Sequence, residues 1–311
     1  MIQLFANFVE DNDDVDVVLV CVDAATYTNA QYLRRKMWKS DMNSMKGFNS
    51  LSNDMLSRCK DLAILASKGE LSLFIGAGVS IGAGCPSWFQ LLGIIEDAFT
   101  PTGSESERKI GNKVNWDALT FADALEEVCK TETDRSGLQK SLKERIAIIV
   151  DRPFPSLLMT LLASLPTEGT ITQNYDRGAE MAYNNLNLVE HNINNKHQLS
   201  VIPYNPMKGA NTWLLKMHGC VTSIDDIVIT SADFARFEKN KQALGGLVQA
   251  NLLTSHMLFV GFSMTDMNYL RIIEEVRDAL KPSNQTKVVA SGDLQGSRSK
   301  PNITGKFKTI N

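Results

Sequence analysis

The sequence predicts an α/β fold, with a mostly parallel sheet, helices on both of its faces, and a helical insertion. Short apolar runs rich in β-branched residues alternate with helical patterns along most of the chain. A long helical stretch, from 87 to about 165, separates two of these runs. The 311 residues are 43% hydrophobic, so the chain can bury one large core or two smaller ones.

The first 45 residues read as a separate strand–helix segment. VDVVLVCVD (15–23) is a β-branched run that suits a strand covered on both faces, and NAQYLRRKMW (29–38) predicts a helix. The polar, glycine-containing stretch SDMNSMKGFNS (40–50) then predicts a linker. The main domain is therefore expected over residues 52–291.

The main domain begins with an amphipathic helix over 52–69, with Ser52 or Asn53 as its N-cap and Gly69 as its end. The strand LSLFI (71–75) follows and leads into a glycine-rich turn. Helices are expected within the insertion at 87–99, 115–130, 137–150 and 154–165. Strands are expected at 169–173, 187–191, 212–218, 226–230, 256–262 and 286–291, with a helix at 267–280. The polar, basic tail 292–311 predicts disorder.

Composition excludes several classes of protein. No apolar run approaches the roughly 20 residues that span a bilayer, and the acidic N-terminus is unlike a signal peptide, so we expect a cytoplasmic protein without a membrane partner. The net charge of −3 and the absence of a basic stripe argue against nucleic-acid binding. The five cysteines are scattered and form no CxxC pair, which favours reduced thiols and no zinc or other metal site.

The glycine-rich turn GAGVSIGAG (76–84) is a candidate nucleotide cradle. Where a parallel strand meets a helix, backbone N–H groups converge, and glycines let the chain approach a diphosphate closely. The alternative is that these glycines serve only a tight turn. The turn matches neither GxGxxG, which would need glycine where Ile81 stands, nor a P-loop, which would need GK[ST].

Polar residues also follow three other predicted strands. TQNYD puts Asn174 and Asp176 just past one strand end, and MHG puts His218 past another. VGFS adds Gly261 and Ser263 at a third. Because the carboxyl ends of parallel strands meet at one edge of a sheet, we expect all four loops to face one crevice.

In this order, GAGVSIGAGCPSW, TQNYD, MHG and VGFS resemble the sirtuin superfamily over roughly residues 52 to 291. The resemblance implies a Rossmann-like domain that binds NAD and cleaves its nicotinamide–ribose bond. Deacylating sirtuins carry two zinc-binding CxxC pairs and a GIPDFR-like run, whereas this chain has no CxxC and reads GCPSW. The sequence therefore looks more like the zinc-free sirtuin-like NAD hydrolases of bacterial antiphage defence, with NAD as substrate and no zinc.

The resemblance also implies roles for matching residues. Asn174 would order the nicotinamide ribose and the attacking water, and His218 would be the catalytic base; the alternatives are a turn-closing Asn and a structural His. Trp88 would wall the nicotinamide pocket, or else simply face the core of its helix. Asp176 joins the nucleotide-binding set, although its main expected role is to cap the next helix. The remaining expected NAD contacts are Gly76, Ala77, Gly78 and Ser80 for the diphosphate, and Gly261 and Ser263 near the adenosine ribose.

Three functions stay open at this point. NAD hydrolysis to nicotinamide and ADP-ribose is the first; the second is protein ADP-ribosyl transfer, which breaks the same bond. The third is a non-catalytic NAD or ADP-ribose sensor. A homo-oligomer or a regulatory partner is also expected, because an enzyme that depletes NAD must be held inactive.

A second resemblance concerns the N-terminal segment. VDVVLVCVDAATYTNAQYLRRK is similar to the last strand and helix of macrodomains, the ADP-ribose-binding modules. Residues 1–45 would then be a macrodomain remnant. The alternative is an ordinary strand–helix unit docked on the sirtuin-like domain.

Overall fold

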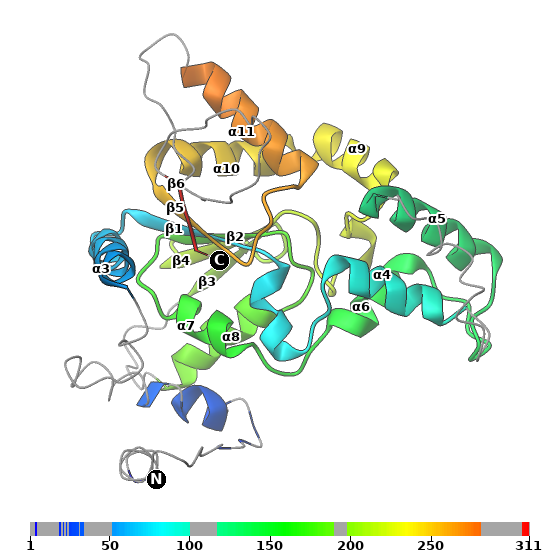
Figure 1. The fold of residues 1–311 in the computed structure, drawn as a ribbon, viewed down its shortest axis with the longest axis horizontal. Coiled ribbons are helices and arrows are strands. Elements are labelled where there is room, and N and C mark those ends of the chain that lie inside the picture. Colours follow the sequence, from blue (N-terminus) through cyan, green and yellow to red (C-terminus); the bar gives the residue numbers. More distant parts are fainter. Residues whose placement is uncertain are drawn as a thin grey trace.

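The computed structural model describes residues 52–99, 117–189, 198–280 and 307–310, and also positions 4, 19, 21, 23, 25–30, 32 and 33. Over these ranges the chain forms a six-stranded sheet in the order β3-β4-β2-β1-β5-β6, and every strand pair is parallel. The strands are β1 (Leu71–Ile75), β2 (Gly169–Thr172), β3 (Leu199–Ile202), β4 (Thr212–Lys216), β5 (His256–Val260) and β6 (Phe307–Ile310). The predicted α/β class, with a parallel sheet and covering helices, is confirmed (Figure 1).

The helices are α3 (Asn53–Ser67), α4 (Trp88–Asp97), α5 (Ala118–Thr131), α6 (Leu142–Val150), α7 (Leu157–Ala163), α8 (Gly178–Val189), α9 (Ser231–Asn240), α10 (Gln242–Thr254) and α11 (Met267–Leu280). Short 3-10 turns are η2 (Ala77–Val79), η3 (Ile81–Ala83) and η5 (Ile224–Asp226). Ser52 caps α3 by accepting a hydrogen bond from the Met55 N–H, as one of the two predicted N-caps should.

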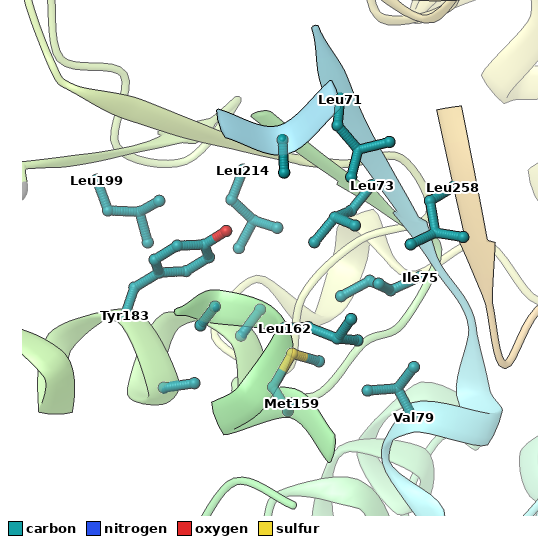
Figure 2. Packing of buried hydrophobic residues seen from close by; sticks show 14 of the residues in the cluster. Leu71, Leu73, Ile75, Val79, Met159, Leu162, Tyr183, Leu199, Leu214 and Leu258 are labelled. Atoms are coloured by element: carbon teal, nitrogen blue, oxygen red, sulfur yellow. The ribbon is translucent and has the colours of Figure 1, made fainter. Parts of the chain in front are cut away.

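One face of the sheet is covered by α3, α7 and α8. All five residues of β1 are buried, and Leu71, Leu73 and Ile75 point toward Met159 of α7 and Tyr183 of α8 (Figure 2). Alternate side chains of a strand face opposite sides of its sheet, which explains why one apolar run serves two cores.

The other face of the sheet is covered by α10 and α11, seen above the strands in Figure 1. Phe74 of β1 lies on this face, with its ring centroid 5.4 Å from that of Phe259 in β5 and 4.6 Å from that of Phe262. Tyr269 of α11 meets Phe74 edge-on at 5.4 Å. Such tilted and edge-on contacts are favourable beyond their area, so this aromatic group fixes α11 on the sheet.

The helical insertion divides between two cores. Helices α4, α5 and α6 form a cluster of their own to the side of the sheet (Figure 1), around Leu92, Leu125 and Ile146, which are all fully buried. By contrast, α7 packs on the sheet with Met159 and Leu162. Ile227 and Ile229 fill the insertion's cluster from the segment after η5, so this segment is buried without belonging to the sheet.

Three predicted elements differ from the structure. Residues 187–189 belong to α8 instead of a strand, because the helix that begins at Gly178 continues to Val189. The run 226–230 is no strand: Ile227 and Ile229 pack in the cluster of the insertion, and Val228 packs in the core under α10 and α11. Residues 307–310 pair with β5 as β6, where disorder was expected.

Several predictions fall outside the described residues. These are the strand at 286–291, most of the strand–helix segment 1–45 with its macrodomain resemblance, and the tail up to residue 306. None of the helices in the described ranges is by itself long and apolar enough to cross a membrane; only the bent pair Ala77–Ala83 with Trp88–Asp97 reaches that length and composition together.

Candidate active site

The loops after β1 and β5 meet at the point where the winding of the sheet reverses. β1 lies between β2 and β5. The chain continues from β1 to its neighbour β2 on one side, and from β5 to its neighbour β6 on the other. Ligands of open parallel sheets bind at such switch points, outside the carboxyl ends of the strands. This geometry makes the loops after Ile75 and Val260 the first place to look for a site.

The first two glycines of the turn serve close packing between these loops. The Gly76 N–H donates to the Val260 carbonyl at 3.0 Å, and the Gly78 N–H donates to the Gly261 carbonyl at 2.9 Å. A Cβ on Gly76 would lie 2.4 Å from the Gly261 oxygen, and one on Gly78 would lie 2.7 Å from the Gly261 Cα. Gly261 itself has φ +62°, a conformation that suits glycine. The turn is therefore held against the neighbouring loop, backbone to backbone.

Asn174 ties the loop after β2 to the glycine turn. Its Nδ2 donates to the Gly76 carbonyl at 3.0 Å and to Ser80 Oγ at 3.1 Å. Because a carbonyl can only accept, these contacts fix the orientation of the amide. The main chain of Asn174 is held as well, by a hydrogen bond from its N–H to Thr172 Oγ1 at 3.0 Å.

Ser80 and Asp176 complete this hydrogen-bonded group. Buried Ser80 donates from its Oγ to Asp176 Oδ2 at 2.8 Å. The other oxygen of Asp176 accepts from the Gly178 N–H at 2.7 Å, at the first residue of α8. Asp176 thus caps the helix, the main role predicted for it, and also holds Ser80.

His218 lies just past β4, next to β2 in the sheet, and is 4% exposed. The rings of Phe234 and Phe237 meet it edge-on, at 5.3 and 5.6 Å between centroids. Its Nε2 lies 3.2 Å from Asn268 Nδ2 and 3.8 Å from Asp266 Oδ2. Burial lowers the pKa of His218 below its ordinary value, although the Asp266 carboxylate acts in the opposite direction.

The predicted site residues do not all meet in one place. The turn residues Gly76, Gly78 and Ser80 contact Asn174 or Gly261, as described above. Ala77 and Ser263 are exposed beside them, and Ser263 Oγ shares a hydrogen bond with Thr265 Oγ1 at 2.8 Å. Asn174 and His218 follow neighbouring strands, but the structure has no hydrogen bond between these two described side chains. Trp88 packs against the cluster of the insertion, as the alternative prediction had it.

Lys216 is a polar residue of this region that the sequence did not single out. It is the last residue of β4 and is fully buried. Its Nζ donates to Glu180 Oε1 at 2.8 Å, to the Asp176 carbonyl at 2.5 Å and to the Tyr175 carbonyl at 3.5 Å. Burial is the largest single influence on the Lys216 ammonium and lowers its pKa, but Glu180, Cys220 and Asp176 act together in the opposite direction and raise this pKa above its ordinary value. Lys216 therefore holds the loop that carries Asn174, through the carbonyls of Tyr175 and Asp176.

No signal in the pattern of the chain separates Lys216 from a solvated lysine at a strand end. Its partner Glu180 lies in the first turn of α8, far from Lys216 in the sequence, so only the fold shows the pair. Within the described ranges, no group of three or more His, Cys, Asp or Glu side chains could hold a metal ion.

Comparison with known proteins gives one family and a set of relatives. Residues 168–302 match the family model of the SIR2-like domain. The chain is 30% identical over 227 residues to NAD(+) hydrolase ThsA of Enterococcus faecium, a match that covers 70% of this chain and 42% of that protein. It is 25% identical over 226 residues to NAD(+) hydrolase ThsA of Bacillus cereus (strain MSX-D12), covering 71% and 42%.

A third relative is Defense-associated sirtuin 2 of Bacillus subtilis. The identity is 24% over 245 residues, covering 76% of this chain and 22% of that protein. The chain thus spans less than half the length of the curated relatives it matches.

Proposed function

We propose that this sirtuin-like chain, with its SIR2-like domain over residues 168–302, hydrolyses NAD to nicotinamide and ADP-ribose. Similarity to two proteins named NAD(+) hydrolase, over about 70% of the chain, supports the proposal. The structural observation that carries it is the bonding of Asn174 to the glycine turn, through Gly76 and Ser80, at the switch point of the sheet.

We assign to Asn174 the role of orienting the attacking water. Both of its amide hydrogens are used, one by the Gly76 carbonyl and one by Ser80. Its Oδ1 is therefore the group that can accept a hydrogen bond from a water or from a ribose hydroxyl. An acceptor in a fixed position orients the nucleophile before reaction, which is where much of the rate enhancement of such a hydrolysis arises.

We assign to His218 the role of the base that accepts a proton from the attacking water. Burial keeps its imidazole neutral near pH 7, which is the form that accepts a proton. In the reaction the C1′–nicotinamide bond breaks and nicotinamide leaves with the electron pair. The water oxygen bonds to C1′, and the proton of the water passes to His218. No redox step and no metal is required for this balance.

The nucleotide would lie over the loops after β1 and β5. Gly76 and Gly78 pack against the backbone of Gly261. Exposed Ala77, Gly261 and Ser263 are the members of the predicted set that can approach the diphosphate and the adenosine ribose. Ser80 and Asp176, which bind one another, would act mainly by holding Asn174. Trp88 would contribute through the packing of the insertion. A homo-oligomer or a regulatory partner remains part of the proposal.

Product analysis tests this function. The purified chain is incubated with NAD labelled in its adenosine, and both the small molecules and the protein are analysed for label. We expect equal amounts of nicotinamide and free ADP-ribose, with no label on protein. Intact NAD would contradict the proposal. Label bound to protein would contradict hydrolysis and identify an ADP-ribosyltransferase.

A further inference from the structure

The Nε2 atom of His218 faces a side chain that the proposed reaction has not used. Asn268, in the first turn of α11, is buried, and its amide lies 3.2 Å from Nε2. The carboxylate of Asp266 lies 3.8 Å from the same atom and accepts a hydrogen bond from the Tyr269 N–H through its other oxygen. The loop after β5 therefore determines the surroundings of one of the two ring nitrogens.

Two arrangements satisfy the contact between Asn268 and His218. The amide can donate to a bare Nε2, and the ring then carries its proton on Nδ1. Alternatively, the amide is turned over, exchanging the Nδ2 that lies 3.2 Å from Nε2 with its oxygen, which then accepts from Nε2–H and leaves Nδ1 bare. A neutral imidazole can act as a base only through its bare nitrogen. In the first arrangement that nitrogen is already bonded to Asn268 inside the protein, so only the second arrangement leaves a base available.

The charges around His218 favour the second arrangement. The Asp266 carboxylate is close to Nε2, and a negative charge stabilises a proton on the nearer nitrogen. Lys241 also acts on the ring electrostatically, in the opposite sense, but its ammonium is paired with Asp226 at 3.4 Å. The aromatic rings that meet His218 edge-on, those of Phe234 and Phe237, are uncharged.

We propose that Asn268 is a positioning residue for His218: its amide oxygen holds the proton on Nε2, so that Nδ1 is the atom that accepts the proton of the attacking water. This inference rests on the proposed hydrolysis, because it assigns the atom of the base. It makes the loop after β5 part of the catalytic arrangement in addition to its contact with the glycine turn.

The first test is NMR of the protein labelled in histidine with 15N and 13C. The chain has four histidines, and the His218→Gln variant identifies the signals of His218. Above the pKa of His218, we expect the tautomer protonated at Nε2 in the wild type and a mixture in Asn268→Leu. A tautomer protonated at Nδ1 would overturn the proposal. This measurement needs no turnover, so it decides the question even if the chain proves unable to cleave NAD.

The second test is the pH dependence of NAD turnover. In Asn268→Leu we expect kcat to fall about 10- to 100-fold, with little change in KM. This loss is a part of the roughly 10²–10⁴-fold rate enhancement that a general base contributes. In Asn268→Asp a carboxylate beside Nε2–H raises the pKa of His218, so the acid limb of kcat/KM moves to higher pH by roughly one unit. Unchanged kcat and pH profile in both variants would overturn the proposal.

Asn185→Leu is the matched control for Asn268→Leu. Asn185 is a similarly buried asparagine on α8, on the opposite face of the sheet, and its Nδ2 has no hydrogen-bond partner among the residues that the structure describes. We expect Asn185→Leu to have the same kcat and the same histidine NMR signals as the wild type.

Discussion

Removal of the buried ammonium of Lys216 by the Lys216→Met substitution will strongly destabilise the fold. Methionine nearly matches the length of the lysine stem, so the cavity left behind is small. The carboxylate of Glu180 would lose its partner at 2.8 Å, and the carbonyls of Tyr175 and Asp176 would lose a donor.

The size of the effect follows from the burial of the pair. Taking one partner from a buried ion pair costs about 3–5 kcal/mol, because the remaining charge is left without compensation. Lys216 is fully buried, but the side chain of Glu180 is 16% exposed, so we expect a value near the lower end, about 3 kcal/mol. In Lys216→Met/Glu180→Leu no charge is left behind, and the loss falls to about 1–2 kcal/mol, the cost of the unpaired carbonyls.

Equilibrium unfolding in urea, followed by circular dichroism, measures these free energies. The control is Lys130→Met, which breaks an exposed pair with Glu126 one helical turn away and changes the stability by less than about 0.5 kcal/mol. If the double variant were as unstable as Lys216→Met, the unpaired charge would not be the cause, and the reasoning would be refuted.

Two further predictions concern the site and its loops. Burial lowers the pKa of His218 below its ordinary 6.5, so the base stays neutral in mildly acidic solution; the acid limb of kcat/KM for NAD should lie below pH 6.5, and a limb above pH 7 would count against His218. In Gly76→Ala the new Cβ meets the Gly261 oxygen at 2.4 Å, which lowers the stability by about 1–3 kcal/mol. At Gly246, in an exposed part of α10, a new Cβ would meet no described atom within 4 Å outside its own helix, so Gly246→Ala should raise the stability by about 0.5–1 kcal/mol. Thermal melts of both variants check this contrast, and a Gly76→Ala protein that melts like the wild type would contradict the packing of the turn.

The central strands could be predicted because burial on both faces requires continuous apolar runs. Leu71–Ile75 and His256–Val260 follow that rule, whereas Gly169–Thr172 and Thr212–Lys216 were recognised because most of their residues are β-branched or apolar. The same rule misled at 226–230, where Ile227 and Ile229 are buried in the cluster of the insertion and Val228 is buried on a face of the sheet, without a strand being formed. Residues 187–189 carry strand-like apolar residues, but the helix cooperatively extends through them.

The site could be predicted in outline. The motifs suggested a resemblance to the sirtuin-like NAD hydrolases of bacterial antiphage defence, and the comparisons confirm that resemblance. The loop positions of Asn174 and His218 follow directly from the strand order. The supporting contacts do not, because Lys216 meets Glu180, and His218 meets Asn268, only through long-range packing. A local pattern carries no information about such pairs.

The most direct test of the account compares NAD turnover by the wild type, Asn174→Ala and Asn211→Ala. The side chain of Asn211 also bonds to the main chain, accepting from the Gln198 N–H at 3.3 Å, but Asn211 precedes β4 and so lies at the opposite edge of the sheet. We expect nicotinamide and ADP-ribose from the wild type and from Asn211→Ala, and a rate at least about 100-fold lower from a folded Asn174→Ala protein, because its water is no longer oriented. Equal rates in all three proteins would contradict the role of Asn174 and the site built around it.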